Sequence, residues 1–144
     1  MKIAITGGSG FIGTFLTKEL LESGHSVRIL DIEPSKAYPD LYRYTDITDL
    51  NQLTQNLKDI DAIYHLAAAH RDDIFPRSIY YDVNVKGTEN IIKAAQQQDI
   101  KTIIFSSTVA VYGLDSGESK ETSTPAPFND YGQSKLQAEE ALKV

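Results

Sequence analysis

The sequence pairs a tyrosine with a lysine four residues later, Tyr131 and Lys135 in the segment YGQSK. On a helix, side chains at positions i and i+4 lie on the same face, so both would reach one site. An ammonium group beside a phenol favours the phenolate and lowers the pKa of the phenol below its usual value of about 10. Such a pair suits a general base near neutral pH. Considered alone, the spacing is weak evidence for such a base, because it arises often by chance and favours a surface tyrosine packed on a lysine stem.

Three glycines near the N-terminus, Gly7, Gly10 and Gly13, follow the spacing G-x-x-G-x-x-G. They separate a predicted strand over residues 2–6 from a predicted helix that begins at residue 11. Without a Cβ atom the loop can turn tightly, and a pyrophosphate can approach the backbone N–H groups at the helix N-terminus. The last glycine permits close packing of helix on strand. The pattern predicts a dinucleotide-binding loop.

Two acidic residues, Asp31 and Asp46, lie at the ends of predicted strands. Asp31 follows the second strand, where a carboxylate can accept both ribose hydroxyls and would repel a 2′-phosphate. NAD is therefore favoured over NADP, although Arg28 and Lys36 nearby leave NADP open. Asp46 and Ile47 close the third strand, where they could flank the adenine; an exposed turn aspartate is the alternative interpretation of Asp46.

The hydrophobic pattern alternates strands with helices along the chain. Strands are predicted over 2–6, 26–30, 41–47, 62–67 and 102–107, and helices from 11, over 50–58 and 80–98, and from 130. This alternation indicates an α/β fold, a Rossmann-type doubly wound parallel sheet of about five strands. Asp49 is predicted to cap the helix over 50–58, and a loop is predicted over 113–129. Along the helix over 80–98 one stripe is expected to be buried: Tyr81, Val85, Thr88, Ile92 and Ala95. Thr108 follows the fifth strand at the carboxyl edge of the sheet, where ligands bind in such folds.

Composition narrows the class of protein. The 144 residues suit one domain, and the net charge of −6 argues against a nucleic-acid surface. Without cysteine, and with three scattered histidines, no metal site is expected. His65, in an apolar strand, is interpreted as a hydrogen-bonded core histidine rather than a ligand. No apolar run approaches the ~20 residues of a membrane span, and no signal-peptide pattern is present, so a cytoplasmic location is predicted.

With these motifs in place, the chain resembles the extended short-chain dehydrogenases/reductases of the NAD-dependent epimerase/dehydratase family, in particular its nucleotide-sugar 4-epimerases. The resemblance covers all 144 residues. Its motifs are TGGSGFIG (6–13), Asp31, DI (46–47), HLAA (65–68), YYDVNVKGT (80–88), FSSTVAVYG (105–113) and YGQSK (131–135).

The resemblance implies a role for each matching residue. Tyr131 would be the acid/base, Lys135 would anchor the ribose and tune the tyrosine, and Thr108 would hydrogen-bond the reacting oxygen. The remaining residues implied to bind the cofactor are Phe11 and Ile12, through their backbone amides, and Leu66, Ala67, Ala68 and Asn84.

The implied reaction is NAD-dependent epimerisation of a nucleotide sugar. The Tyr131 phenolate would take a proton from a substrate hydroxyl while a hydride passes to the nicotinamide, and reversal on the other face of the sugar would give the epimer. Dehydratases of the family carry acidic residues where this chain has Val109 and Ala110, so elimination is disfavoured. A reductase or dehydrogenase on another alcohol or carbonyl substrate, and a non-catalytic dinucleotide sensor, remain the alternatives.

The resemblance also bears on domain organisation. Family members are longer and carry a C-terminal domain that grips the substrate. Residues 1–144 are therefore expected to form the NAD(P)-binding Rossmann domain with the catalytic residues, to lack the C-terminal substrate domain, and to be inactive alone. A homodimer is expected for the full-length protein, paired through the predicted helices over 80–98 and from 130.

Overall fold

The structure is a computed structural model that describes residues 1–114 and 117–143. Part of the loop predicted over 113–129, at positions 115 and 116, lies outside the described residues. The chain divides into two compact units. The sheet unit comprises Met1–Ala67 and Asn90–Ser106, and the second unit comprises Ala68–Glu89 with the described residues from Ser107 onward.

Five parallel strands form the centre of the sheet unit, in the order β3-β2-β1-β4-β5. They are β1 (Lys2–Thr6), β2 (Ser26–Asp31), β3 (Tyr42–Tyr44), β4 (Ala62–His65) and β5 (Thr102–Phe105). The order reverses between β1 and β4, which makes the carboxyl ends of these two strands the switch point where ligands bind in doubly wound sheets. The Rossmann-type prediction is confirmed.

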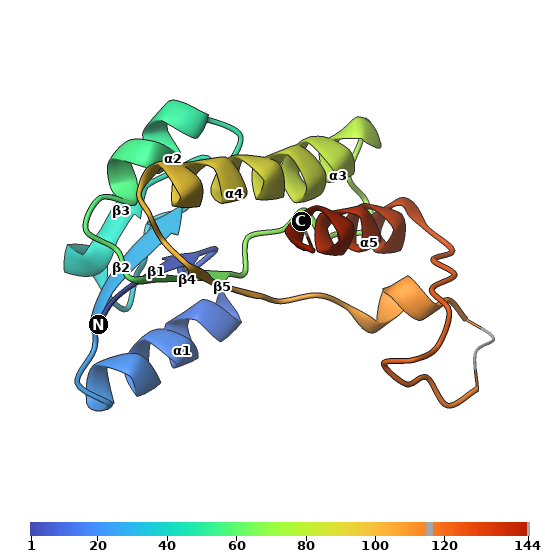
Figure 1. Cartoon of the computed structure of the whole chain (residues 1–144), viewed down its shortest axis with the longest axis horizontal. Coiled ribbons are helices and arrows are strands. Elements are labelled where there is room, and N and C mark those ends of the chain that lie inside the picture. The colour runs from blue at the N-terminus through green and yellow to red at the C-terminus, as the bar shows by residue number, and fades with distance from the viewer. Residues whose placement is uncertain (115–116, 144) are drawn as a thin grey trace. The chain divides into compact units, whose positions relative to one another are not determined.

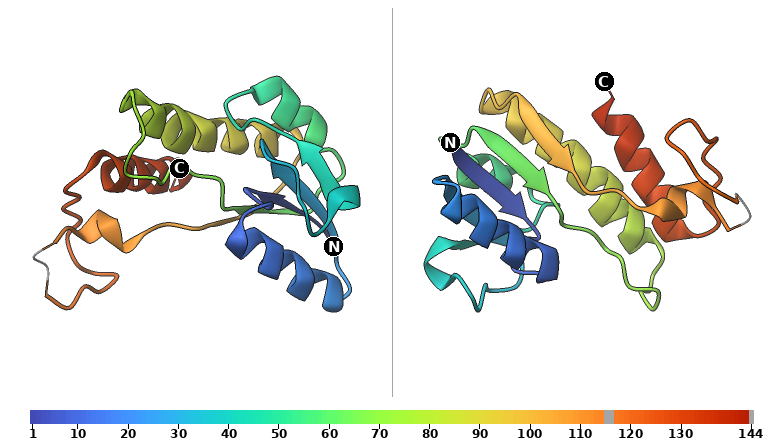
Figure 2. Two further views of the ribbon diagram at one scale, coloured as in Figure 1. Left: turned by 180° about the vertical axis from the view of Figure 1, so that it is seen from behind. Right: turned by 90° about the horizontal axis from the view of Figure 1, so that it is seen from below.

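Helices cover both faces of the sheet. Helix α1 (Phe11–Glu22) lies on one face, and α2 (Leu50–Asn56) lies on the other with the Asn90–Gln97 part of α4 (Gly87–Gln97) (Figures 1 and 2). A short 3-10 turn, η1 (Pro39–Leu41), precedes β3. Helix α2 begins as predicted at Asp49, whose side chain accepts a hydrogen bond from the Gln52 backbone N–H. Such a cap stabilises a helix by about 1 kcal/mol.

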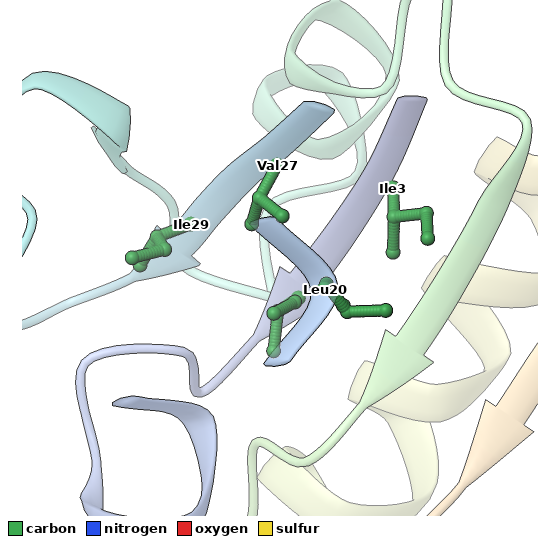
Figure 3. Packing of buried hydrophobic residues seen from close by; sticks show 5 residues of the cluster. Ile3, Leu20, Val27 and Ile29 are labelled. Atoms are coloured by element: carbon green, nitrogen blue, oxygen red, sulfur yellow. The ribbon is translucent and has the colours of Figure 1, made fainter. Parts of the chain in front are cut away.

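The core beneath α1 follows from the period of two along the strands. Ile3 and Ile5 of β1 and Val27 and Ile29 of β2 pack with Leu20 of α1 (Figure 3). The residues between them point to the opposite face. Ala4 on that face is equally buried, so β1 is a nearly continuous apolar run, typical of parallel sheets covered on both faces. In β2 the residue between Val27 and Ile29 is Arg28, which is half-buried.

The regular elements of the second unit are helical. Its elements are α3 (Ser78–Tyr81), the π-helical segment η2 (Asp82–Lys86), the start of α4, the 3-10 turn η3 (Val109–Tyr112) and α5 (Asp130–Leu142). None of the helices in the described ranges is long and apolar enough to cross a membrane.

Helix α3, η2 and α4 together correspond to the helix predicted over 80–98, but the predicted buried stripe is partly wrong. The structure buries Tyr80 and Asn84, whereas Tyr81 and Val85 are only half-buried. The reason is the π turn, whose i→i+5 hydrogen bonds insert an extra residue and rotate the helical faces. After the π turn, Thr88 and Ala95 are buried as predicted, whereas Ile92 is only half-buried and its neighbour Ile91 is buried instead.

Candidate functional site

Gly7 makes the turn out of β1 and passes close to the end of β4. Its φ is +68°, and a Cβ atom there would lie 2.7 Å from the backbone N of Ala67. Gly13 has a similar role on the other side of the loop, where a Cβ would lie 2.5 Å from the Cα of Gly8. Both positions exclude any side chain, because the atoms that would clash belong to backbone. The loop is therefore held close to the switch point of the sheet.

The N-terminus of α1 is open above this loop. Gly10 is its N-cap residue and supplies no side-chain hydrogen bond, and the side chains of Phe11 and Ile12 are exposed. A Cβ at Gly10 would meet only the Gly7 carbonyl oxygen, at 3.4 Å. Within the described part of the sheet unit, packing around Gly10 thus leaves space beside the first backbone N–H groups of α1. A pyrophosphate fits that environment, since these N–H groups and the helix dipole favour an anion.

Asp31 joins the end of β2 to the glycine-rich loop. Its two carboxylate oxygens accept hydrogen bonds from the backbone N–H groups of Ser9 and Glu33, each at 3.0 Å. The Ser9 hydroxyl also donates to the Glu33 carbonyl oxygen, at 2.7 Å. A carboxylate offers about four acceptor positions, so two remain for ribose hydroxyls. Sequence reasoning found Asp31 but missed Ser9, which shows no spacing signal of its own.

Asp46 and Ile47 form a turn after β3. Asp46 Oδ1 accepts hydrogen bonds from the backbone N–H and the hydroxyl of Thr48, at 2.9 and 2.8 Å, and the Ile47 side chain is buried. Their contact with an adenine stays a prediction.

The residues that follow β4 lie beside the turn made by Gly7. The Leu66 backbone N–H donates to the Thr6 carbonyl oxygen at 3.0 Å, and the Ala67 N–H donates to the Thr6 hydroxyl oxygen at 3.4 Å. That hydroxyl also bonds His65 Nδ1 at 2.7 Å. His65 is buried, which confirms its interpretation as a core histidine.

Helix α5 carries Tyr131 and Lys135 one turn apart, as the spacing predicts. Asn129 caps the helix by accepting from the Gly132 backbone N–H at 2.8 Å. Tyr131 is half-buried, whereas Lys135 is only 2% exposed. Burial lowers the pKa of Lys135 to about 8, and the nearby Glu139 carboxylate opposes part of this shift. The lysine therefore sits in a desolvated environment one helical turn from the phenol.

Thr108 lies in the same unit, just before η3. Its Oγ1 accepts a hydrogen bond from the Ala110 backbone N–H at 3.2 Å, so the hydroxyl proton is directed elsewhere. That proton can be donated to a substrate oxygen. Gly132 of α5 packs closely on this segment, because a Cβ there would lie 2.7 Å from the Ala110 carbonyl oxygen. The structure thereby brings the segment that follows Thr108 against the turn that bears Tyr131.

Asn84 and Ala68 also belong to the second unit. Asn84 is 2% exposed, and its amide bonds the backbone of Ala69 and the hydroxyl of Ser134. Ala68 is half-buried in the loop after β4. Sequence reasoning missed Ser134, and it missed the hydrogen bond that Ser107 donates to Glu139. Within the described residues, no group of three or more histidine, aspartate or glutamate side chains is placed to hold a metal ion.

The comparison with known families agrees with this arrangement of residues. The profile of the NAD dependent epimerase/dehydratase family matches residues 3–144. The chain belongs to this family. Solved structures with the same fold include a short-chain dehydrogenase/reductase superfamily protein from Agrobacterium tumefaciens with bound NAD. It is 26% identical with a TM-score of 0.92, over 99% of this chain and 44% of that one.

Several relatives by sequence are, by their names, sugar epimerases. N-acetyl-alpha-D-glucosaminyl-diphospho-ditrans,octacis-undecaprenol 4-epimerase of Escherichia coli O157:H7 is 43% identical, over 98% of this chain and 42% of that protein. UDP-glucose 4-epimerase of Lacticaseibacillus casei is 38% identical, over 99% of this chain and 46% of that protein. The structure of the UDP-Glc/GlcNAc 4-epimerase of Campylobacter jejuni has a TM-score of 0.89 at 34% identity, over 99% of this chain and 48% of that one. The chain thus spans less than half the length of each.

Proposed function

We propose that the protein is an NAD-dependent epimerase of diphosphate-linked sugars, with a nucleotide sugar as the leading substrate class. The observation that carries this proposal is Lys135, almost fully buried one helical turn after Tyr131, in a chain whose glycine-rich loop suits a pyrophosphate. Because the chain spans less than half of its relatives, the activity is proposed for the complete protein. In that protein, residues 1–144 would be the NAD(P)-binding Rossmann domain, and a C-terminal domain would hold the substrate.

The residues of this chain fit NAD at two places. The space above the N-terminus of α1 would receive the pyrophosphate, and the Asp31 carboxylate would accept the ribose hydroxyls. Bound NAD would take a hydride from the substrate carbon and return it, which is chemistry that no side chain can supply. The protein contributes position and the path of the proton.

Three side chains would move or stabilise that proton. The phenolate of Tyr131 would take it from the substrate hydroxyl and later return it to the same oxygen. The positive charge of Lys135 would favour the phenolate, and Thr108 would donate a hydrogen bond to the reacting oxygen. Val109 and Ala110 carry no group that can transfer a proton, which supports epimerisation over elimination of water.

Two further candidates come from particular relatives. The relative from Escherichia coli O157:H7 acts, by its name, on a sugar linked through a diphosphate to undecaprenol, so a polyprenyl-diphosphate sugar is the second substrate class. A 3-beta-hydroxysteroid dehydrogenase of Mycolicibacterium neoaurum is 35% identical over 96% of this chain, which favours an alcohol dehydrogenase as the third. Turnover assays of the complete protein would distinguish the three classes. The substrates are UDP-N-acetylglucosamine, the same sugar on a polyprenyl diphosphate in detergent, and a 3β-hydroxysteroid with NAD.

Tyr131→Phe should abolish turnover while leaving the cofactor bound. We expect kcat of the complete protein to fall at least about 100-fold, since general acid–base groups contribute that much or more. NAD affinity, measured by calorimetry, should change less than about threefold. Tyr112→Phe removes a phenol elsewhere in the same unit and serves as the control. A Tyr131→Phe variant that retains turnover would contradict the proposed role, and a wild-type protein that binds NAD but converts none of these substrates would favour the dinucleotide sensor.

Asp31→Asn should weaken NAD binding and reduce the preference for NAD over NADP. Hydrogen bonds to a charged group contribute about 1.5–3 kcal/mol, so we expect NAD affinity to fall about tenfold or more. Titrating the 144-residue chain with NAD and with NADP measures both effects, and the exposed Asp40→Asn is the control. Equal affinity of the wild-type chain for both cofactors would contradict the assignment of Asp31.

The proposal includes a cytoplasmic homodimer. Sedimentation of the complete protein tests the dimer, and a monomer mass that does not change with concentration would contradict it. Cell fractionation tests the location.

A further inference from the structure

Asn84 lies in the π-helical segment η2 and uses its side-chain amide to hold a single peptide group. Its Oδ1 accepts from the Ala69 backbone N–H at 2.8 Å, and its Nδ2 donates to the Ala69 carbonyl oxygen at 3.0 Å. These two bonds determine which way the amide faces, because the opposite orientation would place oxygen against oxygen and N–H against N–H. The second N–H of Nδ2 therefore points to its third partner, the Ser134 hydroxyl oxygen, at 2.9 Å.

The direction of the next hydrogen bond follows from this one. Ser134 accepts from Asn84, so its own proton is free to be donated, and the acceptor is the Tyr131 carbonyl oxygen at 2.8 Å. Ser134 is fully buried and Asn84 nearly so. Among the described residues, no buried side-chain nitrogen or oxygen lacks a partner. The four groups form one directed chain from the Ala69 peptide to the backbone of Tyr131.

We propose that Ser134 is a positioning residue of the catalytic site: through Asn84 it holds the first turn of α5, with Tyr131 and Lys135, against the loop that follows β4. This inference rests on the catalytic roles proposed above for Tyr131 and Lys135. It also assigns Asn84 an indirect part, since its amide acts through the peptide of Ala69 and the hydroxyl of Ser134.

Other contacts hold the same turn, and Ser134 complements them. Gly132 lies against the Ala110 carbonyl oxygen, and the Tyr81 hydroxyl donates to the Asp130 carboxylate at 2.9 Å. Ser134 adds the buried attachment to Asn84. A shift of about 1 Å at a catalytic group can lower a rate about 100-fold. Removing Ser134 leaves the turn attached through Gly132 and Asp130 but without its buried link to η2.

The test is Ser134→Ala in the 144-residue chain, with Thr54→Ala as a matched control. Thr54 also donates a hydroxyl hydrogen bond to a helix carbonyl, that of Leu50 at 2.8 Å, but in α2 of the sheet unit. The first readout is the titration of the Lys135 ammonium group, followed by NMR of ¹³C-labelled lysine and assigned with Lys135→Met. The second is NAD affinity as a function of pH.

We expect Ser134→Ala to move the titration midpoint of Lys135 by more than about half a pH unit and to weaken NAD binding about tenfold. Thr54→Ala should change neither the titration midpoint of Lys135 nor the NAD affinity. If Ser134→Ala changes stability as Thr54→Ala does and leaves both readouts unchanged, the role is structural and the proposal is overturned. Should Ser134→Ala fail to fold, Ser134→Cys, which keeps a weak donor and acceptor, is measured in the same way.

A double-mutant cycle tests the link through Asn84. If the two side chains act as one unit, Asn84→Ala and Ser134→Ala together should weaken NAD binding little more than either alone. Fully additive effects would overturn the link. The lysine titration needs no cofactor, so it tests the inference separately: failure of the wild-type chain to bind NAD would count against the proposed function only.

Discussion

Gly7→Ala is expected to destabilise the chain by about 3 kcal/mol and to weaken NAD binding more than tenfold. An alanine at φ +68° would adopt left-handed backbone, which costs about 1–2 kcal/mol. Its Cβ would also lie 2.7–2.9 Å from backbone atoms of Leu66 and Ala67, and forcing atoms into a packed region costs about 1–3 kcal/mol more. Because the obstructing atoms are backbone, relief would have to displace the ends of β1 and β4, where the cofactor is expected to lie.

Gly24→Ala separates the two contributions. Gly24 has a similar φ of +81°, but a Cβ there would have no atom within 4 Å. The Gly24→Ala variant should lose only about 1 kcal/mol of unfolding free energy and should keep its NAD affinity. Denaturant unfolding and calorimetric titration of both variants provide the comparison. Equal losses of stability for Gly7→Ala and Gly24→Ala would show that the close approach to Ala67 contributes nothing.

Lys135→Met is expected to stabilise the chain at pH 7 while abolishing NAD binding. The pKa of Lys135 falls from 10.5 to about 8 through burial, so the ammonium group opposes folding by about 3 kcal/mol at neutral pH. Methionine retains most of the aliphatic stem without the charge, and such replacements stabilise by about 1–4 kcal/mol in other proteins. Stability and cofactor binding would then change in opposite directions, which is common where an active site holds a desolvated charge.

The pH dependence has a definite sign. Between pH 8 and 10.5 the unfolded chain holds the lysine proton and the folded chain releases it, so this lysine makes folding more favourable as pH rises. Below about pH 8 the lysine is protonated in both states, so the full free-energy cost of burying its charge opposes folding. The difference in unfolding free energy between Lys135→Met and wild type should therefore narrow by about 2 kcal/mol from pH 7 to 9.5. Lys93→Met, at an exposed position of α4, should show no such narrowing.

Local spacing alone determined the element order and most of the candidate residues. The apolar run before Gly7, the aspartate at position 31 and the i, i+4 pair of Tyr131 and Lys135 each depend on residues close together in the chain. The same holds for the Asp49 cap, which lies three residues from its partner. Such features follow from backbone geometry and side-chain chemistry, which do not require the rest of the fold.

Contacts between distant segments were decided by the tertiary structure. Asn84 and Ser134 are 50 residues apart in sequence, and nothing in the spacing of either predicts their hydrogen bond. The π turn that brings Asn84 to this position interrupts the regular 3.6-residue period, so it also shifted the buried face of the predicted helix. The low pKa of Lys135 belongs to the same class, because desolvation depends on which segments cover the ammonium group and not on its neighbours in the chain.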